Sequence, residues 1–303
     1  MKRNLAIATL CMGVGLVAGT GCGPTHPATP AIGAAPSPAP DRVAQRLAQY
    51  QATLAEVQAL QPPPVPPSTV GIAVDQSGSM GFSRIATATY SDVKPVVDAL
   101  VRTGGTLALS KICDRSDVPL VRTTFAEPPR LGQLPAIGNP PERPKSDRGD
   151  PFQIQKHLKQ YEKDLAAYEQ QLGTAQQTLD AYKQQLSQHQ QTSQQQLERL
   201  KPEIEAILNH PRNCQATDIQ RAIERTNVLF QEPIAWSQPP RTYAVFITDG
   251  LDTFSSAPAK LQADKVVLVN GSETLGIFQS VRHERFEAPQ VALSAVADWM
   301  LKP

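Results

Sequence analysis

The sequence is poor in aromatic residues, nearly balanced in charge and without a long apolar run after its first twenty residues. Aromatic residues make up 5% of the 303 residues, whereas 28 residues are proline, so parts of the chain are unsuited to packing into a core. The net charge is +1, which gives no strong field to attract nucleic acid. No later stretch reaches the ~18 apolar residues of a membrane-spanning helix.

The motifs of common catalytic classes are also missing. His157, His189, His210 and His283 are scattered without the spacing of metal ligands. We find no phosphate-binding loop, no Ser-His-Asp order and no Cys-His pair. No His or Glu is placed to act as a general base, so we expect a protein that is not an enzyme.

Residues 1–22 have the pattern of an export signal. Lys2 and Arg3 precede an apolar run over 5–18, and small residues then lead to Cys22. This ending resembles the lipobox of bacterial lipoproteins, in which the cysteine is lipidated, although Gly19 stands where an aliphatic residue is usual. Ordinary cleavage that leaves a free Cys22 thiol is the alternative. We expect an exported, lipid-anchored protein that faces the periplasm or the cell surface.

Composition divides the remaining chain into a spacer, a helix and a larger domain. Residues 23–40 form a Pro/Ala/Gly spacer. Residues 41–60 have helical periodicity, and the Pro-rich linker 61–67 ends that helix. Strand-like and helix-like segments then alternate over 68–126 and 211–303. This alternation predicts an α/β fold with a doubly wound, mostly parallel sheet.

Residues 127–210 interrupt the domain as an insertion. A Pro-rich segment, 127–151, precedes a polar helix over 152–208 whose leucines repeat every seven residues, the period of a coiled coil. The repeated leucines are Leu158, Leu165, Leu172, Leu179 and Leu186. The pattern lapses in the Gln-rich stretch 187–196, and Pro202 weakens its second part.

The heptad pattern leaves the path of the insertion open. The helix either folds into a hairpin near 187–196 or runs as one long helix that the Pro-rich segment brings back. Its seam could pack on the helix 41–60, join a second copy of the chain as a homo-oligomer, or lie on the domain as a single polar helix.

Three short motifs follow predicted strands or open a predicted helix. Asp75, Ser77 and Ser79 end the first core strand, Thr217 opens a helix and Asp249 ends a later strand. Ligand sites of open α/β sheets form at the carboxyl ends of strands, and hard oxygen ligands suit Mg²⁺. Helix capping by Asp75 and Asp249 is the alternative interpretation.

These motifs, IAVDQSGSM, ATDIQRAI and FITDG, resemble the three loops of the metal-ion-dependent adhesion site of von Willebrand factor A (vWA) domains. The resemblance implies a vWA fold, with metal bound through the hydroxyls of Ser77 and Ser79. It implies that Thr217 binds directly or through water, and that Asp75 and Asp249 act largely through water. It also places Cys113 and Cys214 at the same edge of the sheet, which implies a disulfide between them.

The resemblance implies a metal-dependent protein-binding module at the bacterial cell envelope. A divalent cation, Mg²⁺ or alternatively Mn²⁺ or Ca²⁺, would take a carboxylate from an Asp or Glu of a protein ligand. The alternative function is an envelope spacer or oligomerising protein whose coiled coil is the working part. A metal-dependent hydrolase is a third and weaker hypothesis.

Overall fold

The computed structural model describes residues 39–81, 85–114, 116, 120–144, 150–254, 260–269 and 276–303. The predicted export signal with Cys22, and all but the end of the predicted spacer, lie outside the described residues. Val43–Pro303 forms one compact unit, and the residues up to Arg42 are assigned to another. Among the helices of the described residues, none is long and apolar enough to cross a membrane.

Six strands form one sheet in the order β3-β2-β1-β4-β5-β6. The strands are β1 (Ser68–Asp75), β2 (Gly105–Ile112), β3 (Val121–Phe125), β4 (Arg241–Ile247), β5 (Lys265–Val269) and β6 (Glu284–Phe286). All neighbouring strands are parallel except β2 and β3. The order is that of doubly wound α/β sheets, so the predicted fold class is confirmed. The short edge strand β6 was not predicted.

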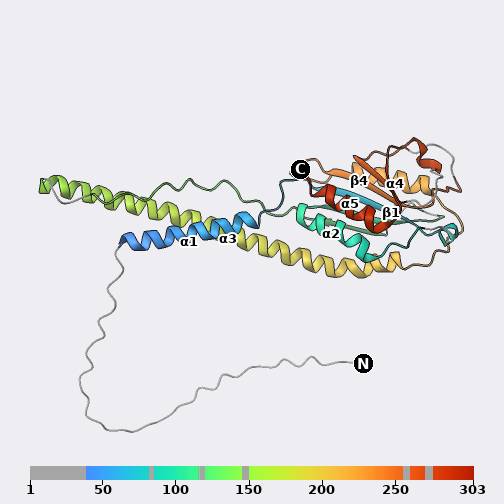
Figure 1. Ribbon diagram of the computed structural model, residues 1–303, viewed down its shortest axis with the longest axis horizontal. Helices are drawn as coiled ribbons and strands as arrows, with labels where there is room; N and C mark the ends of the chain where they lie inside the picture. The colour runs from blue at the N-terminus through green and yellow to red at the C-terminus, as the bar shows by residue number, and fades with distance from the viewer. Residues whose placement is uncertain are drawn as a thin grey trace, which may run out of the picture. The chain divides into compact units, whose positions relative to one another are not determined.

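Helices cover both faces of this sheet (Figure 1). Successive residues of a strand point to opposite faces, and β1 has apolar residues on both. Ile72 and Val74 pack in the cluster that contains residues of α2 (Tyr90–Thr103) and α5 (Pro289–Met300). Ala73 packs in the cluster of α4 (Ile219–Gln231). All eight residues of β1 are buried, which places this strand in the centre of the core.

The insertion contains one continuous helix, α3 (Pro151–Leu208), of 58 residues. At 1.5 Å per residue it is about 87 Å long. The side chain of Asp150 caps its first turn by accepting a hydrogen bond from the Phe152 amide at 3.1 Å. Pro202 lies inside the helix without ending it, because Leu200 and Ile204 on either side pack into the main core. The structure therefore has the long helix and not the hairpin.

The first helix, α1 (Ala39–Ala59), packs against α3 from Val43 onward (Figure 1). Gln176 Nε2 donates to Thr53 Oγ1 at 3.4 Å, and Lys183 forms an ion pair with Glu56 at 2.8 Å. Residue numbers rise together along both helices, so the helices run parallel. The buried seam comprises Val43, Tyr50, Val57, Tyr168, Leu172, Ala175, Leu179, Tyr182 and Leu186.

The Pro-rich segment packs against α1 and α3 as a third element. We call these three packed segments the arm. Leu131, Leu134 and Ile137 are partly buried against the α1–α3 seam, and Tyr182 Oη donates to the carbonyl of Pro129 at 3.2 Å. Contacts at every third residue match the period of a polyproline II helix. Within one chain, α1 and the Pro-rich segment cover the part of the seam over residues 168–186.

We predict that Leu179→Ala destabilises the arm by about 2–5 kcal/mol, because it leaves a cavity in the seam, where Leu179 is fully buried. The helical circular dichroism signal of this variant should be lost at a lower temperature than that of wild type. The exposed neighbour Gln177 provides the control, since Gln177→Ala removes no buried contact. Equal melting of the two variants would show that the seam does not stabilise the arm.

Candidate metal centre

The carboxyl ends of three neighbouring parallel strands meet at one edge of the sheet. Asp75 is the last residue of β1 and pairs in register with Ile112, the last residue of β2. On the other side Val74 pairs with Ile247, the last residue of β4. The chain order reverses between β1 and β4, and open α/β sheets bind ligands at such a reversal. The predicted site therefore lies at the expected place in the fold.

Asp75 is fully buried, and both of its carboxylate oxygens accept hydrogen bonds. Oδ1 accepts from the Ser77 amide at 2.8 Å, and Oδ2 accepts from the Thr248 hydroxyl at 2.7 Å. Burial raises the pKa of Asp75, these hydrogen bonds oppose the rise, and the charge of Asp249 adds to it. The side chain is thus fixed in place, and burial makes its ionised form less stable than it would be in water.

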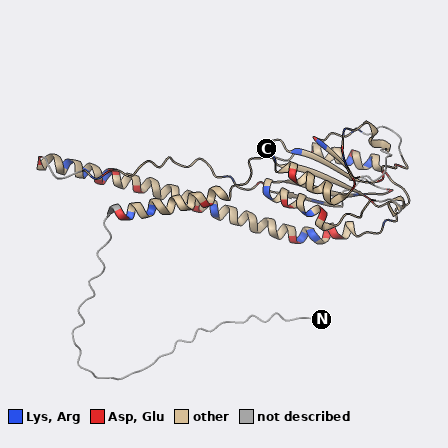
Figure 2. Cartoon of the chain, in the orientation of Figure 1, with Lys and Arg blue, Asp and Glu red and all other residues tan. Residues whose placement is uncertain are grey.

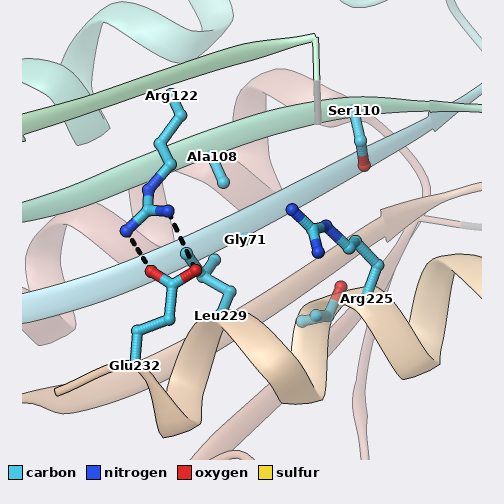
Figure 3. Close-up of a pocket in the computed structure, with 8 residues that line it drawn as sticks. Gly71, Ala108, Ser110, Arg122, Arg225, Leu229 and Glu232 are labelled. Carbon is cyan, nitrogen blue, oxygen red and sulfur yellow. Dashed lines mark hydrogen bonds and ion pairs between the residues drawn. The ribbon is translucent and has the colours of Figure 1, made fainter. Parts of the chain in front are cut away.

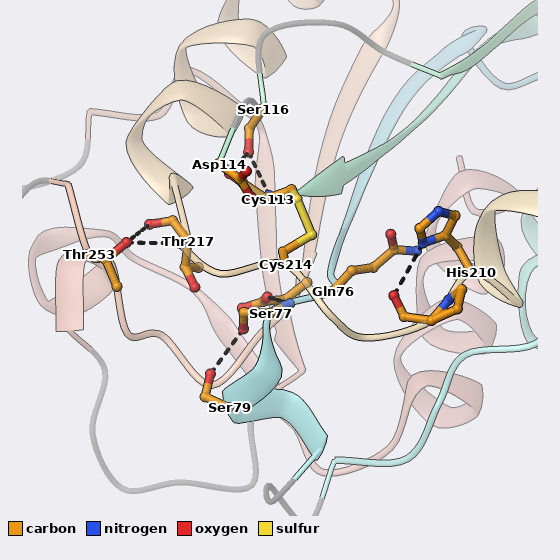
Figure 4. Close-up of a disulfide and its surroundings, with 12 residues drawn as sticks. Gln76, Ser77, Ser79, Cys113, Asp114, Ser116, His210, Cys214, Thr217 and Thr253 are labelled. Atoms are coloured by element: carbon orange, nitrogen blue, oxygen red, sulfur yellow. Dashed lines mark hydrogen bonds between the residues drawn. A yellow bond between two sulfur atoms is a disulfide. The ribbon is translucent and has the colours of Figure 1, made fainter.

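Hydroxyl groups stand beside this carboxylate. Ser77 Oγ and Ser79 Oγ are 2.9 Å apart, and Ser79 is exposed while Ser77 is buried. Thr217 and these two serines lie on the same side of the Cys113–Cys214 disulfide, opposite His210 (Figure 4). The Thr217 amide donates to Thr253 Oγ1 at 2.8 Å, and its carbonyl accepts from the Thr253 amide at 2.9 Å. The loop after β4 therefore holds the Thr217 loop.

Asp249 is 7% exposed and follows Thr248 in the loop after β4. Its Oδ1 accepts a hydrogen bond from the Leu251 amide at 3.0 Å. The negative charge of Asp249 adds slightly to the raised pKa of Asp75. The structure thus brings together Asp75, Ser77 and Ser79 through hydrogen bonds and adds Asp249 and Thr217 from two adjoining loops.

Helix capping does not explain Asp75. Its partners are a loop amide and the Thr248 hydroxyl, whereas α2 begins at Thr89 in a capping box with Asp92. The cap of α4 is Asp218, which accepts from the Arg221 amide at 2.9 Å. Asp252 also serves α4, since it accepts from the Gln220 amide at 2.9 Å. The capping role belongs to Asp218 and Asp252 and not to Asp75.

A disulfide joins Cys113 to Cys214 beside this site (Figure 4). Cys214 also pairs with the Asp75–Ser79 loop, because its amide donates to Gln76 O at 3.0 Å and its carbonyl accepts from the Gly78 amide at 3.1 Å. Asp114 lies near both sulfurs as a possible third ligand of a metal. Metal binding requires thiolates, so the disulfide prevents binding by these cysteines.

The donor set fits a hard divalent cation. It offers hydroxyl oxygens from Ser77, Ser79 and Thr217 and two carboxylates, Asp75 and Asp249, with no nitrogen or thiolate sulfur among them. Oxygen-only sites of this kind suit Mg²⁺, Mn²⁺ or Ca²⁺ more than zinc or copper. Burial raises the pKa of Asp75. A nearby cation would stabilise the ionised carboxylate and so oppose this rise.

A second concavity lies on the α4 face of the sheet (Figure 3). This small recess is lined by Gly71, Ser110, Arg122, Arg225 and Glu232, among others. Arg122 and Glu232 form a two-bonded ion pair across it, one bond of which is 2.8 Å long. The recess opens beside the middle of the strands and not at their carboxyl ends, so it is separate from the candidate metal centre.

Figure 2 shows Lys or Arg positions and Asp or Glu positions interspersed along α3 and the helices that cover the sheet. This mixture agrees with the net charge of +1.

The chain as a whole has little similarity to known proteins. No protein-family model matches the chain. No curated protein matches it either. A crystal structure of the pilus adhesin SpaC from Lactobacillus rhamnosus GG, in an open conformation, aligns with 66% of this chain at 11% identity and a TM-score of 0.27. The chain spans 17% of the adhesin's length. Similarity at this level does not establish a shared fold or function.

Sequence reasoning missed several residues that hold the site. Thr248 binds Asp75, Thr253 binds the Thr217 loop, and Gln76 donates to α3. Thr248 and Gln76 stand inside the quoted motifs, so their positions gave a signal for a supporting role. Thr253 has no such signal, because its partner is 36 residues away in the sequence.

We predict that reduction of the disulfide destabilises the domain. The two cysteines are 101 residues apart, and a loop of that length contributes about 4–5 kcal/mol in the chain-entropy model. Calorimetry should show a melting temperature lower by roughly 10 °C in reductant or in the Cys113→Ala/Cys214→Ala double variant. The double variant should not respond to reductant. If wild type also fails to respond, the disulfide does not stabilise the fold.

Proposed function

We propose that this chain is a vWA-like protein-binding module that uses a divalent cation at the Asp75 edge of the sheet. The observation that carries the proposal is the Ser77–Ser79 hydroxyl pair, 2.9 Å apart, beside a buried carboxylate at the end of the central strand. The order of the three loops along the chain supports it, since they belong to β1, the start of α4 and β4.

Each residue has a distinct role in this proposal. Ser77, Ser79 and Thr217 would hold the cation through hydroxyl oxygens. Asp75 accepts from the Ser77 amide and the Thr248 hydroxyl, so it would orient the loop and balance charge. Asp249 would balance charge from the other side. When bound, Mg²⁺ or Mn²⁺ offers an open coordination position to an Asp or Glu carboxylate of a protein ligand.

The surface beside the site suits a protein ligand. Leu251 and Phe254 are 51% and 61% exposed and lie within five residues of Asp249. Their amides donate to Asp249 Oδ1 and Asp252 Oδ1, so the loop is held in place while both apolar side chains face solvent. Large apolar side chains that surround a charged contact are typical of binding hot spots.

An envelope location fits the same proposal. The Cys113–Cys214 disulfide suits an oxidising compartment outside the cytoplasm. The predicted signal and lipidated Cys22 would tether the chain, and the predicted Pro/Ala/Gly spacer would separate the domain from the anchor. The spacer function is the second candidate, because α3 has 58 residues, a length of about 87 Å, and its residues 168–186 form a buried seam with α1.

Calorimetric titration of Mg²⁺ and Mn²⁺ into the purified protein tests the proposal. Wild type should bind one ion, and Ser77→Ala should abolish binding because it removes a hydroxyl from the donor set. Ser110→Ala is the control, since Ser110 is a hydroxyl of the mid-sheet recess and its loss should leave binding unchanged. Absence of binding by wild type would sink the metal-dependent function and favour the spacer.

We predict that Asp75→Asn raises the stability of the metal-free protein at neutral pH. Asn can accept from the Ser77 amide through its oxygen and donate from its NH2 group to the Thr248 hydroxyl, so it fills both positions without burying a charge. The pKa of Asp75 is raised in the folded state, so its ionised form lowers stability above that pKa. The gain should appear as a higher melting temperature than that of wild type.

The gain should shrink as the pH falls through the raised pKa toward the ordinary range of aspartate, because wild type then protonates Asp75. Thermal melts in a chelator between pH 5 and 8 measure this. Asp218→Asn is the matched control, since Asn caps a helix as well as Asp does. Lower stability of Asp75→Asn at every pH would contradict the burial argument.

A further inference from the structure

The last turn of α3 is hydrogen-bonded to the loop that carries Asp75, Ser77 and Ser79. Gln76 is buried between the first two of these residues, and its Nε2 donates to the carbonyl of Ile207 at 2.7 Å. Ile207 itself packs in the main core. A single side chain therefore links the candidate metal centre directly to the helix that forms the arm.

Arg212 makes a second connection just beyond the end of α3. Its Nη1 donates to the carbonyl of Met80 at 2.8 Å and to that of Ile85 at 3.4 Å. Met80 follows Ser79 directly, so Arg212 holds the far end of the same loop. The charge of Asp75 also acts on Arg212, where it opposes the lowering of the guanidinium pKa by burial.

Cys214 makes the third connection. Its backbone pairs with Gln76 and Gly78, and its side chain is bonded to Cys113. Residues 207–214 therefore hold the loop 76–80 at both ends and in the middle. In Figure 4 the side chain of Gln76 extends toward the segment of His210, away from the Ser77–Ser79 pair.

Residues 207–214 and the loop 76–80 together form a joint between α3 and the sheet. Two buried polar atoms of this joint have no hydrogen-bond partner. Among the described residues, Gln76 Oε1 is a buried acceptor without a donor, and Arg212 Nη2 is a buried donor without an acceptor. Buried polar atoms are nearly all paired in native proteins. A joint that holds one unpaired acceptor and one unpaired donor can change its pairing when the loop or the helix shifts, without first breaking a complete network.

We propose that Gln76 is a positioning residue of the metal centre, through which docking of the end of α3 is linked to metal binding. The proposal rests on the proposed function, since it requires that the protein binds a cation. Gln76 sets the position of the Asp75 and Ser77 backbone while its own side chain is held by α3. Linkage is reciprocal, so metal binding should in turn strengthen the docking of α3.

The consequence for function is a connection between the arm and the ligand site. A partner or a mechanical load that shifts α3 along the sheet would pull on Gln76 and Arg212. Both residues act on the loop that holds the hydroxyl pair, so affinity for the metal and its ligand would change. The arm would then act on binding at the site instead of serving only as a spacer.

The test compares two glutamines that both join α3 to the sheet domain. Gln76→Met removes the bond to Ile207 but keeps a side chain of similar length. Gln196→Met removes the bonds from α3 to Thr123 and Thr124 at the edge strand, far along the helix from the metal loop. Mn²⁺ affinity of the full chain is measured by calorimetry, and amide hydrogen exchange is measured with and without Mg²⁺.

We expect about fivefold weaker Mn²⁺ binding in Gln76→Met, because the loss of one buried hydrogen bond changes an equilibrium constant by about this factor. Binding by Gln196→Met should be unchanged. In wild type, Mg²⁺ should slow exchange at residues 204–209. In Gln76→Met this effect should vanish, while slowing at 249–253 persists.

Three results would overturn the linkage and leave the metal site standing. These are equal binding by all three proteins, equal weakening by both variants, and weakening without any metal effect on exchange at 204–209 in wild type. Absence of Mn²⁺ binding by wild type is a different result, because it overturns the proposed function and the linkage together.

Discussion

The parallel pairing of β1 with both of its neighbours is the constraint on which the rest of the structure depends. Because β1, β2 and β4 run in one direction, their carboxyl ends deliver Asp75, Cys113 and Thr248 to a single edge. The burial of all eight residues of β1 fixes the register through the core. The hydrogen bond from Thr248 to Asp75 and the disulfide to Cys214 are possible only because these strand ends are level.

The insertion is compatible with this sheet because α3 returns to that same edge. After 58 residues the helix ends beside the Asp75 loop, and the short connection to α4 carries Arg212, Cys214 and Thr217. The end of α3 is therefore fixed to the sheet domain at this edge by hydrogen bonds from Gln76 and Arg212. The Pro-rich segment makes this geometry feasible, because an extended chain rises about twice as far per residue as a helix and can span the arm in few residues.

The sheet and the site motifs could be predicted from the sequence because their signals are local. Apolar β-branched strands and the motifs around Asp75 and Asp249 are continuous stretches. The path of the insertion could not be predicted, because a heptad pattern is the same in a hairpin and in one long helix. Pro202 is tolerated through packing of Leu200 and Ile204 in the core, a tertiary effect that no local pattern encodes. The packing of Leu131 and Leu134 on the arm was missed because 127–144 has too little apolar bulk to indicate a core.

The buried charge at Asp75 is the part of the site that packing does not explain. An asparagine could accept from the Ser77 amide and donate to the Thr248 hydroxyl in place of the two bonds that Asp75 accepts, without the cost of burying an ionised group. Arg212 supplies one positive charge nearby, but Asp249 adds a second negative charge to the same region, so the three groups leave an excess of negative charge. The hydroxyl groups of Ser77 and Ser79, which can ligate a cation, are 2.9 Å apart in the loop that follows Asp75. A divalent cation would reverse the imbalance, and the resulting positive centre would then attract a carboxylate from a partner.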